Sequence, residues 1–527
     1  MPPQQPARWW EGAVLYQVYV RSFADSNGDG FGDLRGLLEH LEHLVDLGVD
    51  GIWLSPTMPS PDTDWGYDVA DYRGVHPELG TLEDLDALVK AAEAHNIAVL
   101  LDLVPNHTSA LHPWFVAARA ARDAPERDLY VWADPAPGGG PPNNWRDATG
   151  ESAWSLDEAS GQYYLHNFLE TQPDLNWWNP AVHAAFAEIL EFWFARGVAG
   201  FRIDVAHGLY KDAELRDDPV LAPEMAARSH YGLEPTYSAN RPETHGVFRE
   251  WRRLAEATRP PRLLLGETWV FDLERLAAYY GDDDELQLGF NFPFALARFA
   301  PEEIARVVRA TLAALGPRCP VWMASNHDIG RLASRWGGGD ERRARLALCV
   351  LLSLPGTVVL YYGDELAMTD VAVPRHLQRD PMTWGERGGK ANRDRCRTPM
   401  RWSVGETGGF CAPDVRPWLP LGEDERQSVA HQRGEPTSVL QLSRALIALR
   451  HEHLAPGVAP YEEMTVAEDR LVYGVGDLVV AANFADDLCE LSLPADRLLV
   501  SSTLSRPAGV ISAPVVLQPF EAVVCVR

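Results

Sequence analysis

Three carboxylates in this 527-residue chain stand at or shortly after the ends of short apolar runs: Asp204, Glu267 and Asp328. Cleavage of a glycosidic bond needs one carboxyl group that protonates the leaving oxygen and a second that attacks or stabilises the cationic anomeric carbon. We therefore predict that Asp204 and Glu267 form this pair. A carboxyl separation of about 5 to 5.5 Å would give retention through a covalent intermediate, and a wider gap would give inversion. The sequence does not fix that distance.

Other polar residues lie close to these acids. Arg202 stands two residues before Asp204, so in a strand both side chains point to the same side and the guanidinium can keep the carboxyl ionised. His107 and His327 also follow apolar runs and could donate hydrogen bonds to a sugar hydroxyl. A single acid or histidine in such a place is more often a cap, an ion-pair partner or a structural residue. Several at equivalent places favour a binding or catalytic role.

The apolar runs that precede these residues recur along the chain, and amphipathic stretches separate them. We predict strands at 15–20, 51–54, 99–104, 200–203, 262–265, 288–292, 320–323 and 357–360. About eight strands that alternate with helices are typical of a closed parallel (β/α)8 TIM barrel, an α/β fold. Reactive residues in such barrels lie at the carboxyl ends of the strands. This fold would bring the candidate residues to one rim.

Two segments break the alternation. Residues 107–177 are rich in Pro, Gly and Trp and too long for a connecting loop, which predicts an inserted domain after the third strand. A final amphipathic helix around 438–449 is followed by short alternating strands, such as 470–475 and 478–483, which predict a C-terminal antiparallel β-sandwich. The predicted domains are the first part of the barrel at 1–106, the insertion at 107–177, the second part of the barrel at 178–455 and the β-domain at 456–527.

The composition excludes several classes of partner. The formal net charge of −28 repels phosphate backbones and anionic lipids, so we expect no nucleic-acid or membrane partner. Residues 1–10 lack the features of a secretory signal, no apolar run is long enough to span a bilayer, and the six cysteines show no metal spacing. These features predict a cytoplasmic protein with reduced thiols. The oligomeric state stays open.

Four short motifs carry a family resemblance. Residues 102–107 (DLVPNH), 200–205 (GFRIDV), 266–269 (GETW) and 325–328 (SNHD) resemble the four signature regions of the alpha-amylase family of glycoside hydrolases. Three further motifs resemble the alpha-glucosidase and oligo-1,6-glucosidase branch of that family, namely 64–72 (DWGYDVADY), 172–177 (QPDLNW) and 397–400 (RTPM). The resemblance implies a TIM barrel and a short α-glucoside, disaccharide or oligosaccharide, as the substrate.

The resemblance also implies a role for each candidate residue. Asp204 would be the nucleophile, Glu267 the general acid/base and Asp328 the stabiliser of the transition state. A pocket for the terminal glucose would be lined by Asp64, Tyr67, His107, Arg202, His327 and Arg397. Asp64 and Arg397 would pair at its closed end, and Tyr67, Phe168 and Trp154 resemble aromatic platform positions of the family.

The expected activity is exo-acting hydrolysis of short α-glucosides with retention. The same glycosyl-enzyme would also serve transglucosylation, sucrose cleavage or trehalose synthesis, and these alternatives stay open. A remote alternative is a non-catalytic transporter heavy chain, but such relatives need a membrane anchor and tolerate loss of the carboxylates. Val205 directly after the nucleophile accompanies activity on α-1,6 bonds in this branch, and the long segment 206–248 offers no specificity signature.

A candidate cation loop lies at Asp25–Asp33, which reads DSNGDGFGD. It offers oxygen ligands from Asp25, Asn27, Asp29 and Asp33, a carbonyl from Phe31, and glycines for a tight turn. The loop lacks the glutamate at the twelfth position of an EF-hand. It resembles the calcium or magnesium site of this glucosidase branch, which would be structural. The alternative is a hydrogen-bonded turn without metal, and we expect no organic cofactor.

Overall fold

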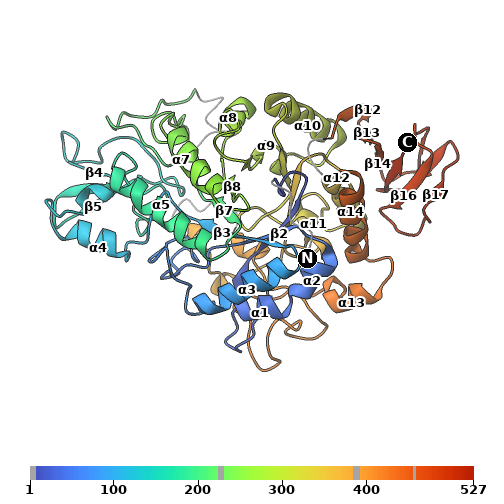
Figure 1. Ribbon diagram of the computed structural model, residues 1–527, viewed down its shortest axis with the longest axis horizontal. Coiled ribbons are helices and arrows are strands. Elements are labelled where there is room, and N and C mark those ends of the chain that lie inside the picture. The colour runs from blue at the N-terminus through green and yellow to red at the C-terminus, as the bar shows by residue number, and fades with distance from the viewer. Residues whose placement is uncertain (1–7, 223–230, 384–391, 455–458) are drawn as a thin grey trace.

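The computed structural model describes residues 8–222, 231–383, 392–454 and 459–527. Its centre is a sheet of eight parallel strands in the order β10-β11-β1-β2-β3-β7-β8-β9 (Figure 1). These strands are β1 Val14–Val18, β2 Gly51–Leu54, β3 Ala98–Leu103, β7 Gly200–Ile203, β8 Leu263–Gly266, β9 Leu288–Gly289, β10 Val321–Met323 and β11 Thr357–Tyr361. The predicted TIM barrel is confirmed, with most strands within one or two residues of their predicted bounds.

The strand predicted at 288–292 is shorter than expected. β9 ends at Gly289, because the Asn291 side chain accepts a hydrogen bond from the backbone N–H of Phe294 at 3.1 Å and so begins a short helix. Among the described strands the hydrogen-bonded ladder runs from β10 round to β9, and these two end strands do not pair. Apolar side chains fill the barrel interior there, since Leu288, Val321 and Met323 belong to one buried cluster.

Helices follow the barrel strands and cover them on the outside, as Figure 1 shows. Helix α3 illustrates why they form where they do: Thr81 and Asp84 make a capping box in which each side chain accepts the other's backbone N–H. The apolar face of α3 then packs into the core through Leu85, Leu88 and Val89. The helices around the barrel are α1 Leu34–Glu39, α2 Leu41–Leu47, α3 Leu82–Ala94, α5 Pro180–Ala195, α7 Thr244–Ala257, α8 Leu273–Ala278, α9 Phe292–Ala295, α10 Pro301–Leu315, α11 Leu332–Arg335, α12 Glu341–Leu352, α13 Val429–Gly434 and α14 Val439–His453.

The segment between β3 and α5 has an architecture of its own. It contains helix α4 Pro113–Ala120 and a three-stranded antiparallel sheet in the order β4-β6-β5, with β4 Trp132–Ala133, β5 Trp154–Asp157 and β6 Gln162–Leu165. Trp145, Trp154 and Leu165 form a small core within it. This arrangement agrees with the insertion predicted after the third strand, while the exact domain boundaries stay predictions.

The last part of the chain forms antiparallel sheets. A six-stranded sheet in the order β12-β13-β14-β19-β16-β17 faces a two-stranded sheet of β15 and β18. One face of β13 packs against the barrel helices, where the Tyr473 hydroxyl lies 2.6 Å from the Ser353 hydroxyl. The opposite face packs on the second sheet through Val472 and Leu517. The bounds are β12 Tyr461–Ala467, β13 Arg470–Val475, β14 Leu478–Asn483, β15 Cys489–Leu491, β16 Arg497–Ser501, β17 Gly509–Val510, β18 Val515–Leu517 and β19 Ala522–Val526.

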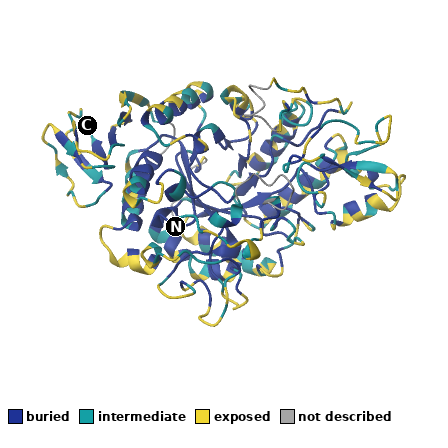
Figure 2. Cartoon of the chain, turned by 180° about the vertical axis from the view of Figure 1, so that it is seen from behind, coloured by how far each residue is buried: buried dark blue, intermediate teal, exposed yellow. Residues whose placement is uncertain are grey.

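The predicted C-terminal antiparallel β-domain is thereby confirmed, and its predicted start at 456 lies outside the described residues. The inserted segment and the C-terminal sheets lie at opposite ends of the long axis of the molecule (Figure 1). The barrel strands between them are buried, and exposed residues gather on loops and outer helices (Figure 2). None of the described helices combines the length and the apolar content that crossing a bilayer requires.

Candidate active site

Register in the barrel brings two of the predicted acids together. β7 and β8 pair in parallel, with Ile203 opposite Gly266. Asp204 follows Ile203 and Glu267 follows Gly266, so both acids leave neighbouring strands at the same rim. The carboxyl ends of parallel strands meet at one edge, which is where TIM barrels carry their chemistry.

Arg202 holds these acids in contact. Its guanidinium is fully buried and lies 2.7 Å from Asp204 Oδ1, 2.8 Å from Glu267 Oε1 and 2.8 Å from Asp102 Oδ1. The carboxyls of Asp204 and Glu267 thus lie on the two terminal nitrogens, Nη1 and Nη2, of one guanidinium. Trp53 covers the guanidinium, whose central carbon lies 4.9 Å from the ring centroid. A single cation thus fixes the two acids that glycoside cleavage needs.

The protonation of this cluster differs from the expectation that Arg202 alone keeps Asp204 ionised. Burial raises the pKa of Asp204 well above its usual range, and Arg202 opposes that shift while Glu267 and Asp102 add to it. Burial likewise raises the pKa of Asp102 to about 6, again against Arg202. Arg202 therefore only partly offsets the cost of an ionised Asp204. Three carboxyls around one buried cation favour a bound proton in the cluster, and a general acid must carry such a proton.

Val205, directly after Asp204, has an unusual backbone conformation. Its φ of 44° lies in the left-handed region, which strains a β-branched residue. In this conformation its N–H donates a hydrogen bond of 3.0 Å to Glu267 Oε2. Both oxygens of Glu267 are therefore held, one by Arg202 and one by Val205. Strain of this kind gathers at functional sites, where the surrounding structure maintains it.

Asp328 faces three nitrogen groups. Its Oδ1 lies 2.9 Å from Arg393 Nη1 and 3.1 Å from Arg397 Nη2, and its Oδ2 lies 3.2 Å from His327 Nε2. Burial alone would raise the pKa of Asp328, but His327, Arg393 and Arg397 together hold it well below its usual range. Asp328 is therefore ionised at any pH near neutrality and can stabilise positive charge that develops on a sugar ring.

The predicted pair of Asp64 with Arg397 is not what the structure shows. Asp64 Oδ1 instead lies 3.0 Å from Arg393 Nη2, while Arg397 donates to the His327 carbonyl at 2.9 Å and to Asp328. Arg393 comes four residues earlier in the same segment and contacts Asp328 as well. It also lies 2.7 Å from Asp380, so one arginine bridges three carboxylates. Sequence reasoning missed Arg393 and Asp380.

The aromatic and histidine residues predicted for the glucose pocket are brought together. The Tyr67 hydroxyl lies 2.7 Å from His327 Nε2 and 3.0 Å from Asp102 Oδ2, and the Tyr67 and His327 rings stack at 5.3 Å. His107 Nε2 lies 3.0 Å from the Tyr67 carbonyl, and the Phe168 ring lies 5.1 Å from the His107 ring. Burial lowers the pKa of His107 to about 4 and holds that of His327 well below its usual range, so both rings are neutral at pH 7. Neutral histidines can donate one hydrogen bond and accept another.

Trp154 does not lie where an aromatic platform for the sugar would have to be. It is only 4% exposed and lies in the core of the inserted segment, stacked on Trp145 at 6.0 Å. Its indole N–H donates to Asn143 Oδ1 at 2.7 Å. The ring is therefore packed and bonded inside the protein, and this part of the prediction is wrong.

Lys211 supports the site from behind and was also missed as a functional residue. It is buried, and its Nζ lies 2.6 Å from Asp174 Oδ2 and donates to Asn106 Oδ1 at 2.7 Å. Asn106 in turn donates to His107 Nδ1 at 3.0 Å, which orients the imidazole. Burial lowers the pKa of Lys211, against the opposing effect of Asp174. A rare lysine soon after the fourth barrel strand was the signal in the sequence.

The predicted cation loop is a closed turn held by its own side chains. Asp25 accepts backbone N–H groups of Gly28 at 2.7 Å and Gly30 at 2.9 Å, and Asp29 accepts that of Phe31 at 2.8 Å. Gly30 has φ +92°, and a Cβ there would lie 2.4 Å from the Arg416 carbonyl, so only glycine fits.

The donor chemistry of this loop fits a hard cation. Asp33 is buried, caps α1 and accepts from the Ser26 backbone, whereas Asn27 and Asp29 are exposed. The side-chain oxygens Asn27 Oδ1 and Asp29 Oδ1 each accept one backbone N–H, so lone pairs remain for an ion. An oxygen-only donor set is the one that Ca²⁺ and Mg²⁺ prefer.

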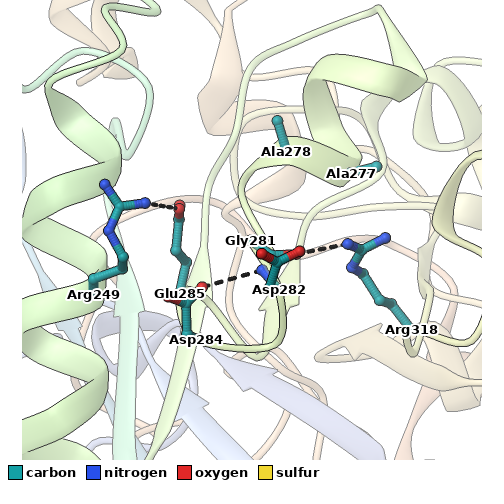
Figure 3. A pocket seen from close by; sticks show the side chains of 8 residues that line it. All are labelled: Arg249, Ala277, Ala278, Gly281, Asp282, Asp284, Glu285 and Arg318. Atoms are coloured by element: carbon teal, nitrogen blue, oxygen red, sulfur yellow. Dashed lines mark hydrogen bonds and ion pairs between the residues drawn. The ribbon is translucent and has the colours of Figure 1, made fainter.

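A separate polar pocket of about 360 Å³ lies beside α7 and α8 (Figure 3). Three of its charged groups have partners: Arg249 lies 2.6 Å from Glu285, and Arg318 donates to the Gly281 carbonyl at 2.6 Å. None of the predicted site residues lines it. The cluster around Arg202 and Arg393, and not this pocket, has the composition of a catalytic site.

Comparison with known proteins agrees with this geometry. The family model described as the catalytic domain of alpha amylase matches residues 17–457. A probable alpha-glucosidase of Rhizobium meliloti is 40% identical over 93% of this chain and 92% of its own length. An oligo-1,6-glucosidase of Heyndrickxia coagulans is 36% identical over 95% of this chain and 98% of its own length.

Solved structures give the same result. The alpha-glucosyl transfer enzyme XgtA superposes with a TM-score of 0.92 at 36% identity, covering 98% of this chain and 99% of its own. The trehalulose synthase MutB from Pseudomonas mesoacidophila superposes with a TM-score of 0.90 at 31% identity, covering 99% of this chain and 100% of its own. With the barrel and the clustered carboxylates, these matches show that the chain belongs to the alpha-amylase family of glycoside hydrolases, as a homologue of alpha-glucosidases and oligo-1,6-glucosidases.

Proposed function

We propose that this protein is a retaining, exo-acting alpha-glucosidase that releases the non-reducing terminal glucose of short α-glucosides. The observation that carries the proposal is that the Arg202 guanidinium holds both carboxyls, Asp204 at 2.7 Å and Glu267 at 2.8 Å. An inverting enzyme separates its carboxyls by about 6.5–9.5 Å to admit a water molecule, whereas a retaining one keeps them at about 5–5.5 Å. Two carboxyls that share one guanidinium are close together, which supports the second arrangement.

The proposed reaction uses these residues in turn. Glu267 gives its proton to the glycosidic oxygen while Asp204 attacks the anomeric carbon, so the leaving sugar departs and a β-linked glucosyl-enzyme forms. Glu267, now ionised, takes a proton from water as the water attacks the same carbon and Asp204 leaves. Ionised Asp328 stabilises the positive charge of both transition states. Two inversions give α-glucose.

The end of the pocket supports exo-action. Arg393 ties Asp64, Asp328 and Asp380 together, and the Gln172 amide lies 3.3 Å from Asp64 Oδ2. These buried polar groups need partners, and the hydroxyls of a terminal glucose would supply them. A chain that continued beyond this glucose would leave some of them unpaired, which costs binding energy.

The proposal is tested by incubating the purified protein with maltose, isomaltose, sucrose, trehalose and kojibiose and following the products by NMR. We expect the α anomer of glucose to form first, before mutarotation. The variant Glu267→Gln, purified in parallel, controls for contaminating glycosidases. Initial release of β-glucose would contradict retention.

Two exposed aromatic residues near Glu267 favour an alternative function, the transfer of glucose to a second sugar. Trp269 and Phe271, two and four residues after Glu267, are 41% and 56% exposed and contact each other edge to face. An open aromatic surface beside the acid/base could bind an acceptor sugar in place of water. The solved relatives named above include a glucosyl transfer enzyme and a trehalulose synthase. Longer sugars or trehalose as main products of the same panel would favour this alternative.

Linkage preference is predicted to depend on Val205. The variant Val205→Thr keeps the β-branched shape that the strained backbone carries, and it adds one hydroxyl beside Glu267. We expect the ratio of kcat/KM for maltose over that for isomaltose to rise by roughly 10-fold. This is the size of effect expected when one added hydroxyl distinguishes weakly between two substrates. Steady-state kinetics on both disaccharides measure it. Val205→Ile, which adds bulk without a hydroxyl, is the control, and an equal ratio in both variants would refute the role of the hydroxyl.

We also propose that the loop of Asp25, Asn27, Asp29, Phe31 and Asp33 binds a structural Ca²⁺ or Mg²⁺. Removal of the ion with a chelator should lower the Tm, because a ligand at 100 times its Kd stabilises the folded state by about 2.7 kcal/mol. Differential scanning calorimetry with chelator, Ca²⁺ or Mg²⁺ measures the effect. Asp29→Asn should abolish the response. Equal Tm values in chelator and in both ions would instead support a turn without metal.

A further inference from the structure

We propose that a second saccharide-binding site lies between the inserted segment and the loop that follows β7, with Trp178 as its platform. A pocket of about 290 Å³ occupies this place. Its lining includes Tyr130, Trp132, Trp178, Lys211 and Asp212, and it includes none of the three catalytic carboxylates. The class of ligand, a saccharide, rests on the proposed function, because the proposed substrates are short α-glucosides.

Trp178 is an exposed aromatic residue in a fixed position. Its indole N–H donates to the Lys211 carbonyl at 2.9 Å, and its ring meets Tyr210 at 4.8 Å in a perpendicular contact. The residue nevertheless remains 45% exposed. A large aromatic ring that is held in place and left open to solvent offers a contact surface for a ligand. The apolar face of a pyranose is a suitable cover, because aromatic rings stack on it.

The polar groups around Trp178 indicate a neutral, hydroxyl-rich ligand. Trp132 and Tyr130 add further aromatic rings to the pocket wall. Asp128 is exposed at the rim, where its carboxylate can accept hydrogen bonds from hydroxyls and disfavours anions, whereas the Asp212 carboxylate is already paired with Arg216 at 2.6 Å. Aromatic walls with an acidic acceptor at the rim match the apolar face and the hydroxyls of a sugar ring.

Lys211 connects this pocket to the residues of the candidate active site. It lines the pocket and at the same time extends its Nζ to Asn106 and Asp174, which belong to the network behind His107. The buried lysine therefore lies between the pocket and His107. A sugar in the second site would therefore bind without reaching Asp204 or Glu267 and would not be cleaved there.

Saturation-transfer NMR on the full chain tests the proposal. The glucose pocket is first blocked with 1-deoxynojirimycin, a glucose-like iminosugar, and maltotriose is then added to the Asp204→Asn variant, which cannot cleave it. We expect maltotriose signals to persist with the pocket blocked, and to fall at least five-fold when Trp178→Ala is added. Trp178→Tyr should restore them, since it keeps an aromatic face.

Controls separate this inference from the proposed function. Leu488→Ala, which removes an exposed apolar side chain in the C-terminal domain, should leave the residual signal unchanged. The single variant Trp178→Ala, with Asp204 intact, should keep the kcat on an aryl α-glucoside, which excludes unfolding. No residual signal after blocking, or a signal that survives Trp178→Ala, would overturn the second site. Failure of 1-deoxynojirimycin to inhibit hydrolysis would instead contradict the proposed glucosidase.

Discussion

Asp204→Asn should lower kcat on every α-glucoside by at least about 10⁴-fold, the scale for loss of a residue that bonds to the substrate. The amide has the shape of the carboxylate but cannot attack the anomeric carbon. Folding should not suffer: burial raises the pKa of Asp204, so its ionised form destabilises the folded state at neutral pH, and the neutral amide removes that cost. Steady-state kinetics and the Tm measure both effects. A variant with half the activity of the parent would refute Asp204 as the nucleophile.

Rescue with azide separates the roles of the two acids. In Glu267→Ala, azide should attack the β-linked glucosyl-enzyme on Asp204 and give α-glucosyl azide. In Asp204→Ala, azide should fill the vacated space, attack α-glucosyl fluoride directly and give β-glucosyl azide. NMR distinguishes the two anomers. The same anomer from both variants would contradict the assignment of nucleophile and acid/base.

Arg393→Lys should lower kcat/KM by roughly 10²- to 10³-fold, because one ammonium group cannot contact three carboxylates as the guanidinium does. Leaving a buried charge without its partner costs about 3–5 kcal/mol. The variant should also change the dependence on pH. Arg393 helps to hold the pKa of Asp328 below its usual range, so its loss raises that pKa. A carboxylate with a depressed pKa contributes stability that disappears as pH falls through its folded pKa.

The loss of activity and of Tm on acidification should therefore begin at a higher pH in Arg393→Lys than in the parent. Profiles of kcat/KM and Tm between pH 3 and 8 measure the shift. Arg395→Lys is the matched control, because Arg395 lies in the same turn but pairs with Asp370 at 3.4 Å, away from the three acids. Coincident profiles for Arg393→Lys and the parent would show that Arg397 and His327 suffice.

The residues at the rim of the barrel could be predicted from the sequence because parallel strands in register bring their carboxyl ends to the same edge. Strands at 200–203 and 51–54 have the predicted bounds, and the pairing of Ile203 with Gly266 places Asp204 next to Glu267. These positions follow from the alternation of strands and helices and need no knowledge of loops. Residues attached to the ends of parallel strands could therefore be placed before any coordinates were known.

Residues on loops were harder to place. Arg393 belongs to no barrel strand, and its reach between Asp64 and Asp328 depends on the path of a long segment after β11. The motif at 397–400 suggested the wrong arginine for Asp64, one turn away. Trp154 shows a different limit: an aromatic residue in an inserted segment suits a core and a sugar platform equally, and only packing against Trp145 decides between them.

The unpaired edges of β9 and β10 have a mechanical consequence. The other neighbouring pairs of described barrel strands share backbone ladders, whereas side chains join this seam. Apolar packing contributes, and the Tyr280 hydroxyl accepts from the Gly289 N–H at 3.0 Å and donates to the Cys319 carbonyl at 3.1 Å. Dispersion contacts yield over small displacements, whereas a ladder resists shear until several bonds break together. We therefore expect heat or denaturant to open the barrel first between β9 and β10, where Gly289 and Val321 lie.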